Sequence, residues 1–197
     1  FDAIFIGGSL INDNKFEARI KYVKKNTDLP VIIFPGSSTQ LSKYADAVLF
    51  LSLISGRNPQ YLIGEHVKSA PIIHNLKLES IPTAYILLDG GIRSSVEIIS
   101  NTTPIPMDKH DIIIAHALAG EYLGNKFVFL ESGSGAEHHA ANEVVNILSN
   151  ILSVPVIVGG GISSLKSAKI LASSGASYIV IGTMLESNPS LHNLLKF

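Results

Sequence analysis

FVFLESGSGA, at residues 127–136, is the first of three apolar runs in the last third of the chain that end in glycine or in glycine and a hydroxyl residue. The second is VIVGGGISS at residues 156–164, and the third is YIVIGT at residues 178–183. Runs of this kind are typical of buried parallel strands. Glycine at a strand end lets backbone N–H groups approach a ligand closely. Because the last two strands of a (β/α)8 barrel commonly form its phosphate site, the pattern predicts a phosphate-binding barrel.

The earlier part of the chain alternates short apolar runs with amphipathic segments. Strands are predicted at residues 3–6, 30–34, 47–53 and 83–88. Helices are predicted at residues 15–25, 61–69, 111–122, 140–149 and 164–173. Such alternation indicates a parallel sheet with right-handed crossovers. Seven strands plus one absent first strand make a (β/α)8 TIM barrel, so we expect one domain over residues 1–197 that is N-terminally incomplete.

A doubly wound open sheet is the main competing fold. That fold places its phosphate-binding glycines after the first strand, whereas here they follow the last two. The segment 93–108 is rich in Ser, Asn, Thr and Pro and is longer than a strand-to-helix turn requires. We therefore expect it to be a lid or a binding loop.

The composition excludes several classes of protein. The 197 residues are 46% hydrophobic and 16% charged, with a formal net charge of −1, which predicts no nucleic-acid partner. The absence of cysteine excludes disulfides, thiolate metal sites and a cysteine nucleophile. No apolar run reaches the roughly 20 residues of a spanning helix. We expect a cytoplasmic protein.

Glu131 is the candidate catalytic residue, because it lies where a predicted strand ends. A carboxylate there could orient or deprotonate a substrate hydroxyl while the following amides bind a phosphate. The alternative is an acid in a surface loop without a catalytic role. Gly160 and Gly161, with Gly182 and Thr183 on the next strand, are the candidate phosphate ligands. The alternative for these is a tight turn without a ligand.

Other polar residues at predicted strand ends have two interpretations each. Ser9 follows two glycines and could contribute an oxygen to a Mg²⁺ ion, although a turn or a helix cap is the commoner role. Arg57 could clamp a diphosphate or pair with an acid. Asp89 could be a base, a metal ligand or a cap. His138 and His139 have no metal-binding spacing, and we expect them in a solvated loop.

Several motifs occur in an order that is more specific than a phosphate barrel. They are IGGS (6–9), FPG (34–36), FLSLISGRNP (50–59), SVEIISNTTPIP (95–106), LESGSG (130–135), GGGI (159–162) and GT (182–183). Together they resemble the geranylgeranylglyceryl phosphate synthase family, and the resemblance covers essentially the whole chain. The stretch 95–106 is its most specific part.

The resemblance implies a Mg²⁺-dependent prenyltransferase that joins sn-glycerol 1-phosphate to geranylgeranyl diphosphate and forms an ether-lipid precursor. It implies that Glu131 contacts the glycerol hydroxyls and accepts the proton, and that Ser9 binds the metal. The remaining substrate-binding residues that it implies are Phe129, Leu130, Ser132, Gly133, Ser134, Gly135, Gly160, Gly161, Gly182 and Thr183. It also implies a homo-oligomer, a dimer or larger, and peripheral contact with a membrane for the lipid product.

The sequence departs from the family pattern in two ways. Phe129 replaces a tyrosine, and the family's first strand, with its metal-binding aspartate and a nearby lysine, precedes the part of the sequence seen here. Other functions therefore stay open. They are a sugar-phosphate isomerase, a flavin-binding oxidoreductase, and an inactive fragment that binds phosphate.

Overall fold

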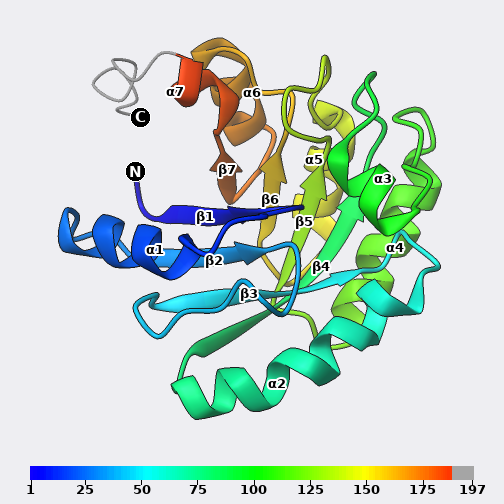
Figure 1. Ribbon diagram of the computed structural model, residues 1–197. Coiled ribbons are helices and arrows are strands. Elements are labelled where there is room, and N and C mark those ends of the chain that lie inside the picture. The colour runs from blue at the N-terminus through cyan, green and yellow to red at the C-terminus, as the bar shows by residue number, and fades with distance from the viewer. Residues whose placement is uncertain (188–197) are drawn as a thin grey trace. The chain divides into compact units, whose positions relative to one another are not determined.

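The computed structural model describes residues 1–187 and divides the chain into two compact units (Figure 1). The first unit contains Phe1–Ser52 and Pro59–Pro82. The second contains Leu53–Asn58 and, among the described residues, 83–187. Both units combine parallel strands with helices, as the periodicity of the sequence predicts. The single domain expected over residues 1–197 stays a prediction.

The first unit is built on three consecutive parallel strands. These are β1 (Ile4–Gly8), β2 (Val31–Pro35) and β3 (Ala47–Leu53), paired in that order. Helix α1 (Phe16–Lys25) follows β1, and a π-helical turn η1 (Gln60–Gly64) leads into α2 (Glu65–Leu76). Phe16 and Ile20 of α1 and Ile73 of α2 pack on strand residues of this unit to form its core. Helices thus follow β1 and β3, β2 leads to β3 without a helix, and the strand order of the unit contains no reversal.

The second unit holds the last four strands. They are β4 (Glu79–Leu87), which enters this unit at Thr83, β5 (Phe127–Glu131), β6 (Val156–Gly159) and β7 (Tyr178–Val180). Each strand pairs in parallel with the next one along the chain. A doubly wound sheet reverses its strand order at a switch point. Neither unit contains such a reversal, so the strand order within each unit favours the barrel class over the open sheet.

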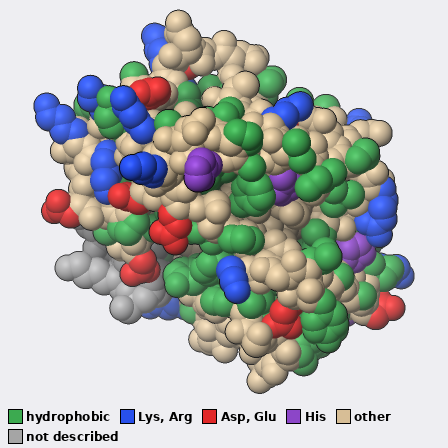
Figure 2. Space-filling model, turned by 90° about the horizontal axis from the view of Figure 1, so that it is seen from below, with side chains coloured by type: hydrophobic (Ala, Val, Ile, Leu, Met, Phe, Trp, Pro, Cys, Tyr) green, Lys and Arg blue, Asp and Glu red, His purple; other side chains and the backbone are tan. Residues whose placement is uncertain are grey.

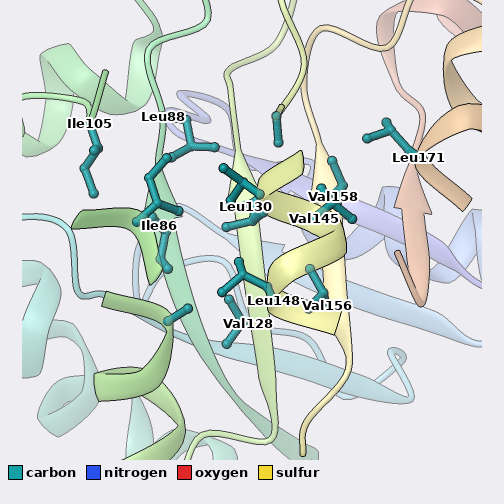
Figure 3. Close-up of a cluster of buried hydrophobic side chains, with 14 of the residues drawn as sticks. Ile86, Leu88, Ile105, Val128, Leu130, Val145, Leu148, Val156, Val158 and Leu171 are labelled. Carbon is teal, nitrogen blue, oxygen red and sulfur yellow. The ribbon is translucent and has the colours of Figure 1, made fainter. Parts of the chain in front are cut away.

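Helices of the second unit cover one face of its strands. They are α4 (His110–Tyr122), α5 (Asn142–Ile151) and α6 (Leu165–Ser173), whereas α3 (Ser95–Ser100) and α7 (Thr183–Ser187) are short helices that follow β4 and β7. Val128 and Leu130 of β5 point into the same cluster as Val145 and Leu148 of α5 (Figure 3). These side chains are completely buried. Alternate residues of β5 are therefore committed to packing against helices, and the residues between them face the other way.

The segment 93–108 differs from the loop that the sequence predicts, because it contains helix α3. Ser94 caps this helix by accepting a hydrogen bond from the backbone N–H of Glu97 at 3.1 Å. Ile105, between two prolines, donates its N–H to Leu87 and accepts from Asp89, both at 2.9 Å. The signal for the helix was present as Ser94 followed three residues later by Glu97. The segment is thus anchored to β4 at Ile105, and its role as a lid or a binding loop stays a prediction.

Charged side chains do not gather into one basic surface on the face shown in Figure 2, where the described acidic, basic and apolar side chains are interspersed. The expectation that nucleic acid is not a partner stays a prediction. In residues 1–187, every helix is too short or too polar to cross a bilayer.

Candidate active site

The site begins with the direction of the side chains on β5. Phe129 and Glu131 alternate with the core residues Val128 and Leu130, so they share the face of the strand that points away from the helices. Glu131 pairs in register with Leu87 on β4 and with Gly159 on β6. The carboxyl group of Glu131 therefore lies at the end of β5, a strand that is paired with β4 on one side and with β6 on the other.

Glu131 is only 7% exposed, although it ends its strand. Its Oε1 accepts a hydrogen bond from the backbone N–H of Gly133 at 2.7 Å. Burial raises the pKa of the Glu131 carboxyl to about 7, and the bond from Gly133 opposes part of that rise. A carboxyl group with this pKa can accept a proton at neutral pH, which is the property required of a general base.

Two glycines at the end of β6, Gly159 and Gly160, lie in close contact with this carboxyl group. A Cβ on Gly160 would lie 2.7 Å from Oε1 of Glu131 and 2.6 Å from the backbone nitrogen of Gly133. A Cβ on Gly159 would lie 3.2 Å from Oε2 of Glu131 and 2.8 Å from Cε2 of Phe129. Gly160 also has a φ of +81°, which an L side chain rarely adopts. These two glycines are required by close packing, in addition to any role in binding phosphate.

The loop after Glu131 combines buried and exposed polar atoms. Ser132 is buried, and within the described residues its Oγ has no hydrogen-bond partner. Gly133 (φ +99°) and Gly135 (φ +74°) turn the chain, while Ser134 between them is exposed. A Cβ on Gly133 would lie 2.8 Å from Cβ of Ser94. The turn therefore exposes the backbone around Ser134 while it buries the ends of the loop.

Ser134 and Thr183 meet although 49 residues separate them, with 3.2 Å between Oγ and Oγ1. Both residues are exposed, and nothing lies within 4 Å of where a Cβ on Gly182 would be. The loop after β5 and the end of β7 are thus brought together around open space. The role of Gly182 and Thr183 as phosphate ligands stays a prediction.

Gly161 also sits in a tight contact. Its φ is +68°, and a Cβ there would lie 2.3 Å from the backbone carbonyl of His138. Helix α6 begins later, at Leu165, and Ser164 caps it by accepting from the N–H of Ser167 at 3.1 Å. One free amide of the α6 N-terminus is therefore already satisfied. An anion beside this loop would depend on the amides of the glycines more than on the helix end.

The other predicted residues have varied positions. Phe129 is completely buried, and its ring meets that of Tyr85 edge-on, with 5.5 Å between centroids. Leu130 points into the helix-facing core (Figure 3), so its side chain lies away from Glu131. Ser9 follows β1 in the first unit and is half-buried. Among residues 1–187, no group of three or more His, Cys, Asp or Glu side chains is arranged to hold a metal.

Arg57 and Asp89 take structural roles in this conformation. Arg57 donates to the carbonyl oxygens of Gly56 at 2.7 Å and Ile54 at 3.2 Å, so it pairs with backbone and not with an acid. Asp89 accepts from the backbone N–H of Gly91 at 3.0 Å, which closes a turn after β4. His138 and His139 lie outside helices and strands, as expected.

Two neighbours of the carboxyl group were not singled out by the sequence. In the sequence, Gly159 stands out only as part of a glycine triplet, and Tyr85 only as part of a predicted strand. The available signal was the period of two along β4 and β5, which places Tyr85 on the face of Phe129 and Glu131 once the register is known. The register itself could not be read from one sequence.

A parallel α/β fold, glycine-rich ends on the last strands and one buried carboxyl group define a phosphate-binding enzyme of the barrel class. The chain belongs to the PcrB family, whose model matches residues 1–196. A geranylgeranylglyceryl phosphate synthase of Chitinophaga pinensis is 48% identical over 190 residues, which are 96% of this chain and 75% of the relative.

Solved structures agree with this assignment. The geranylgeranylglyceryl phosphate synthase of Thermoplasma acidophilum, in complex with sn-glycerol 1-phosphate, matches with a TM-score of 0.92 and 39% identity, over 98% of this chain and 77% of that one. The enzyme of Thermoplasma volcanium matches with a TM-score of 0.91 and 32% identity, over 98% and 78%. The predicted (β/α)8 fold class and the family resemblance are both confirmed.

Proposed function

We propose that this protein is a prenyltransferase that joins sn-glycerol 1-phosphate to geranylgeranyl diphosphate, forming geranylgeranylglyceryl phosphate and diphosphate. Membership of the PcrB family and the names of the curated relatives support this function. The observation that carries it is the buried carboxyl group of Glu131, bonded to Gly133 in a loop whose Ser134 meets Thr183 at the end of β7. Glu131, at one end of that site, can accept a proton, and the hydroxyls of Ser134 and Thr183, at the other end, can bind an anion.

The acceptor substrate would lie with its phosphate against the amides and hydroxyls of the glycine-rich ends. Gly160, Gly161, Gly182 and Thr183 border this region, and Ser134 reaches it from the loop after β5. Backbone N–H groups and hydroxyls are suited to phosphate oxygens. The glycerol hydroxyls would then point toward Glu131.

The chemistry assigned to Glu131 is proton abstraction. The 3-hydroxyl oxygen attacks C1 of the allylic chain, the ether C–O bond forms, and the C1–O bond to diphosphate breaks. Diphosphate leaves with the bonding electrons, and the hydroxyl proton passes to Glu131. The raised pKa of this carboxyl suits the step, since a base titrating near pH 7 is ionised in half of the molecules at that pH.

Mg²⁺ is part of the proposal, but the described residues do not form a complete site for it. Ser9 offers one hydroxyl oxygen, whereas Mg²⁺ prefers six oxygen ligands, usually including carboxylates and water. No carboxylate cluster accompanies Ser9 in residues 1–187. We propose that the ion arrives with the diphosphate and that Ser9 supplies one ligand. No step above depends on the metal.

Location and assembly are also proposals. We propose a cytoplasmic homo-oligomer, a dimer or larger, that contacts the membrane peripherally when it releases its lipid product. Helix α4 supports the assembly, because Ile112 and Tyr122 on it and Leu123 after it are exposed apolar side chains. Light scattering after size-exclusion chromatography would measure the mass, and a monomer at micromolar concentration would contradict the oligomer.

The transferase activity is tested with radiolabelled sn-glycerol 1-phosphate, geranylgeranyl diphosphate and Mg²⁺. We expect a labelled product that partitions into organic solvent, and no product after chelation of the metal. The enantiomer sn-glycerol 3-phosphate is the matched control for the acceptor. The absence of labelled ether from the full-length protein, with a known synthase active in parallel, would overturn the proposal.

A further inference from the structure

The amide side chain of Gln40 bridges the ends of the first two strands of the first unit. Its Nε2 donates to the carbonyl oxygen of Gly8 at 2.8 Å, and its Oε1 accepts from the backbone N–H of Gly36 at 3.2 Å. These two partners fix which end of the amide is nitrogen and which is oxygen. Gln40 is only 3% exposed, so water competes little for either bond. The side chain therefore holds both strand ends at once.

The bridge begins where the two strands stop pairing. The last residue pair in their parallel register is Gly8 with Pro35. The carboxamide of glutamine has the donor and the acceptor of a peptide group, so Gln40 continues the hydrogen bonding of β1 and β2 past that pair. A Cβ on Gly36 would lie 2.3 Å from O of Gly8 and 2.7 Å from O of Ser9. Gln40 thus bonds across a direct contact between the two main chains.

The turn that carries Gln40 is itself anchored. The backbone N–H of Gln40 donates to the carbonyl oxygen of Ser37 at 3.1 Å, which closes the turn. On its other side, the N–H of Ser38 donates to Oε2 of Glu65, in the first turn of α2, at 2.6 Å. Gln40 therefore reaches the end of β1 from a turn that α2 holds in place.

The segment that Gln40 holds has little other support. Among residues 1–187, no other side chain hydrogen-bonds residues 7–12, and Leu10, next to Ser9, is 64% exposed. Helix α1 begins only at Phe16. Loss of the Gln40 bridge would therefore release the end of β1, together with the hydroxyl of Ser9, from its present position.

We propose that Gln40 is a positioning residue that holds the Ser9 end of β1 in place for the diphosphate of the prenyl donor. The bond to Gly8 matters most, because the carbonyl of Gly8 and the nitrogen of Ser9 belong to one planar peptide group. The kinetic consequence rests on the proposed function, in which Ser9 serves the diphosphate half of the reaction. The bridge itself belongs to the folded protein, without substrate or metal.

Amide NMR of the nitrogen-15-labelled protein tests the bridge directly. In Gln40→Leu, which has no polar side-chain atom, we expect hydrogen exchange at the Gly36 amide to accelerate about tenfold or more and the Ser9 nitrogen signal to shift. Gln40→Glu keeps an acceptor but, when ionised, cannot donate, so it should protect the Gly36 amide and still shift the Ser9 signal. Asn75→Leu, at an exposed amide on α2, is the matched control and should change neither signal.

Steady-state kinetics separates positioning from a general loss of structure. Both Gln40 variants should raise KM for geranylgeranyl diphosphate about tenfold, while KM for glycerol phosphate stays within about twofold of wild type. Gln40→Glu is the sharper variant, because it keeps the bond to Gly36 and loses only the bond to Gly8. A loss of folded protein would lower activity with both substrates alike. Asn75→Leu should keep the wild-type constants.

The two arms fail in different ways. Wild-type exchange at Gly36 and an unmoved Ser9 signal in folded Gln40→Leu would overturn the bridge, whether or not the protein makes ether. A broken bridge with an unchanged KM for geranylgeranyl diphosphate would overturn the positioning role. If the wild type makes no ether, the transferase assignment fails and the positioning role falls with it, whereas the NMR result still decides the bridge. Circular dichroism and a thermal melt establish that each variant is folded.

Discussion

The backbone N–H of Gly133 donates to Oε1 of Glu131 at 2.7 Å, and it is the hydrogen bond that the loop after β5 gives this buried carboxyl group. The bond keeps the side chain directed along the end of its own strand. It also favours the ionised form against burial, so the balance of the two effects leaves the pKa of Glu131 near 7.

Replacing Glu131 with Gln should remove the base and keep the fold. Gln retains an oxygen that can accept from Gly133, but it cannot take the proton of the glycerol hydroxyl. We expect kcat to fall about 10²- to 10⁴-fold while the variant stays folded at neutral pH. Glu137→Gln, in the same loop and exposed, is the matched control and should stay active. Full activity of Glu131→Gln would assign the base elsewhere.

The pH dependence of stability should reveal the raised pKa of Glu131. Between about pH 4.5 and 7 the folded protein keeps this proton while the unfolded chain has lost it. Glu131 therefore contributes on the order of 3 kcal/mol to the free energy of unfolding below pH 4.5. This contribution is lost as the pH rises to 7. Urea unfolding of wild type and Glu131→Gln at each pH should show a difference in stability that grows in the variant's favour across this window.

His66 in the first unit should act in the opposite direction. Its Nε2 lies 3.0 Å from Oγ of Ser52, and burial lowers the pKa of this imidazole. As the pH falls below about 6.5, the unfolded chain binds the proton first, so stability is lost on acidification. In the Glu131→Gln background, His66→Phe should flatten the remaining slope between pH 5 and 6.5. A slope that persists would place its source in another group.

Two glycine substitutions should separate packing from ligand binding. Gly160→Ala introduces a Cβ against Glu131 and Gly133 at a positive φ, so it should lower the free energy of unfolding by about 1–3 kcal/mol and reduce kcat. Gly182→Ala meets no protein atom within 4 Å, so its stability should be unchanged. If Gly182 borders the phosphate, KM for glycerol phosphate should rise. Equal melting temperatures for both variants would refute this distinction.

Ser132 provides a test of the unpaired buried hydroxyl. Because its Oγ has no partner among the described residues, Ser132→Ala should be neutral or should stabilise the free protein by about 1 kcal/mol. If the bound glycerol phosphate supplies the missing partner, the same change should weaken its binding about fivefold or more in calorimetry. Ser163→Ala, exposed in the loop after β6, is the control. A destabilised Ser132→Ala would mean that the hydroxyl is already bonded.

Periodicity located the strands well because their apolar runs are short and sharply bounded. The expected strand at residues 47–53 coincides with β3, and Glu131 was placed at a strand end where β5 indeed stops. Helix α3 was missed, because its six residues lie among Ser, Asn, Thr and Pro that favour a loop. The tight contact of Gly160 with Glu131 and the pairing of Tyr85 with Phe129 depend on register and on main-chain approach, which leave no pattern in a single sequence.

The close approach of Gly133 and Gly160 to Glu131 has a consequence for how this protein can vary. The atoms that close on Glu131 at the proposed acceptor site are main chain, so exchanging side chains there cannot enlarge or reshape that site in small steps. Alteration there requires a new loop path. Divergence in acceptor preference should therefore proceed by insertion or deletion in these loops, while divergence in the length of the transferred chain remains open to single substitutions elsewhere.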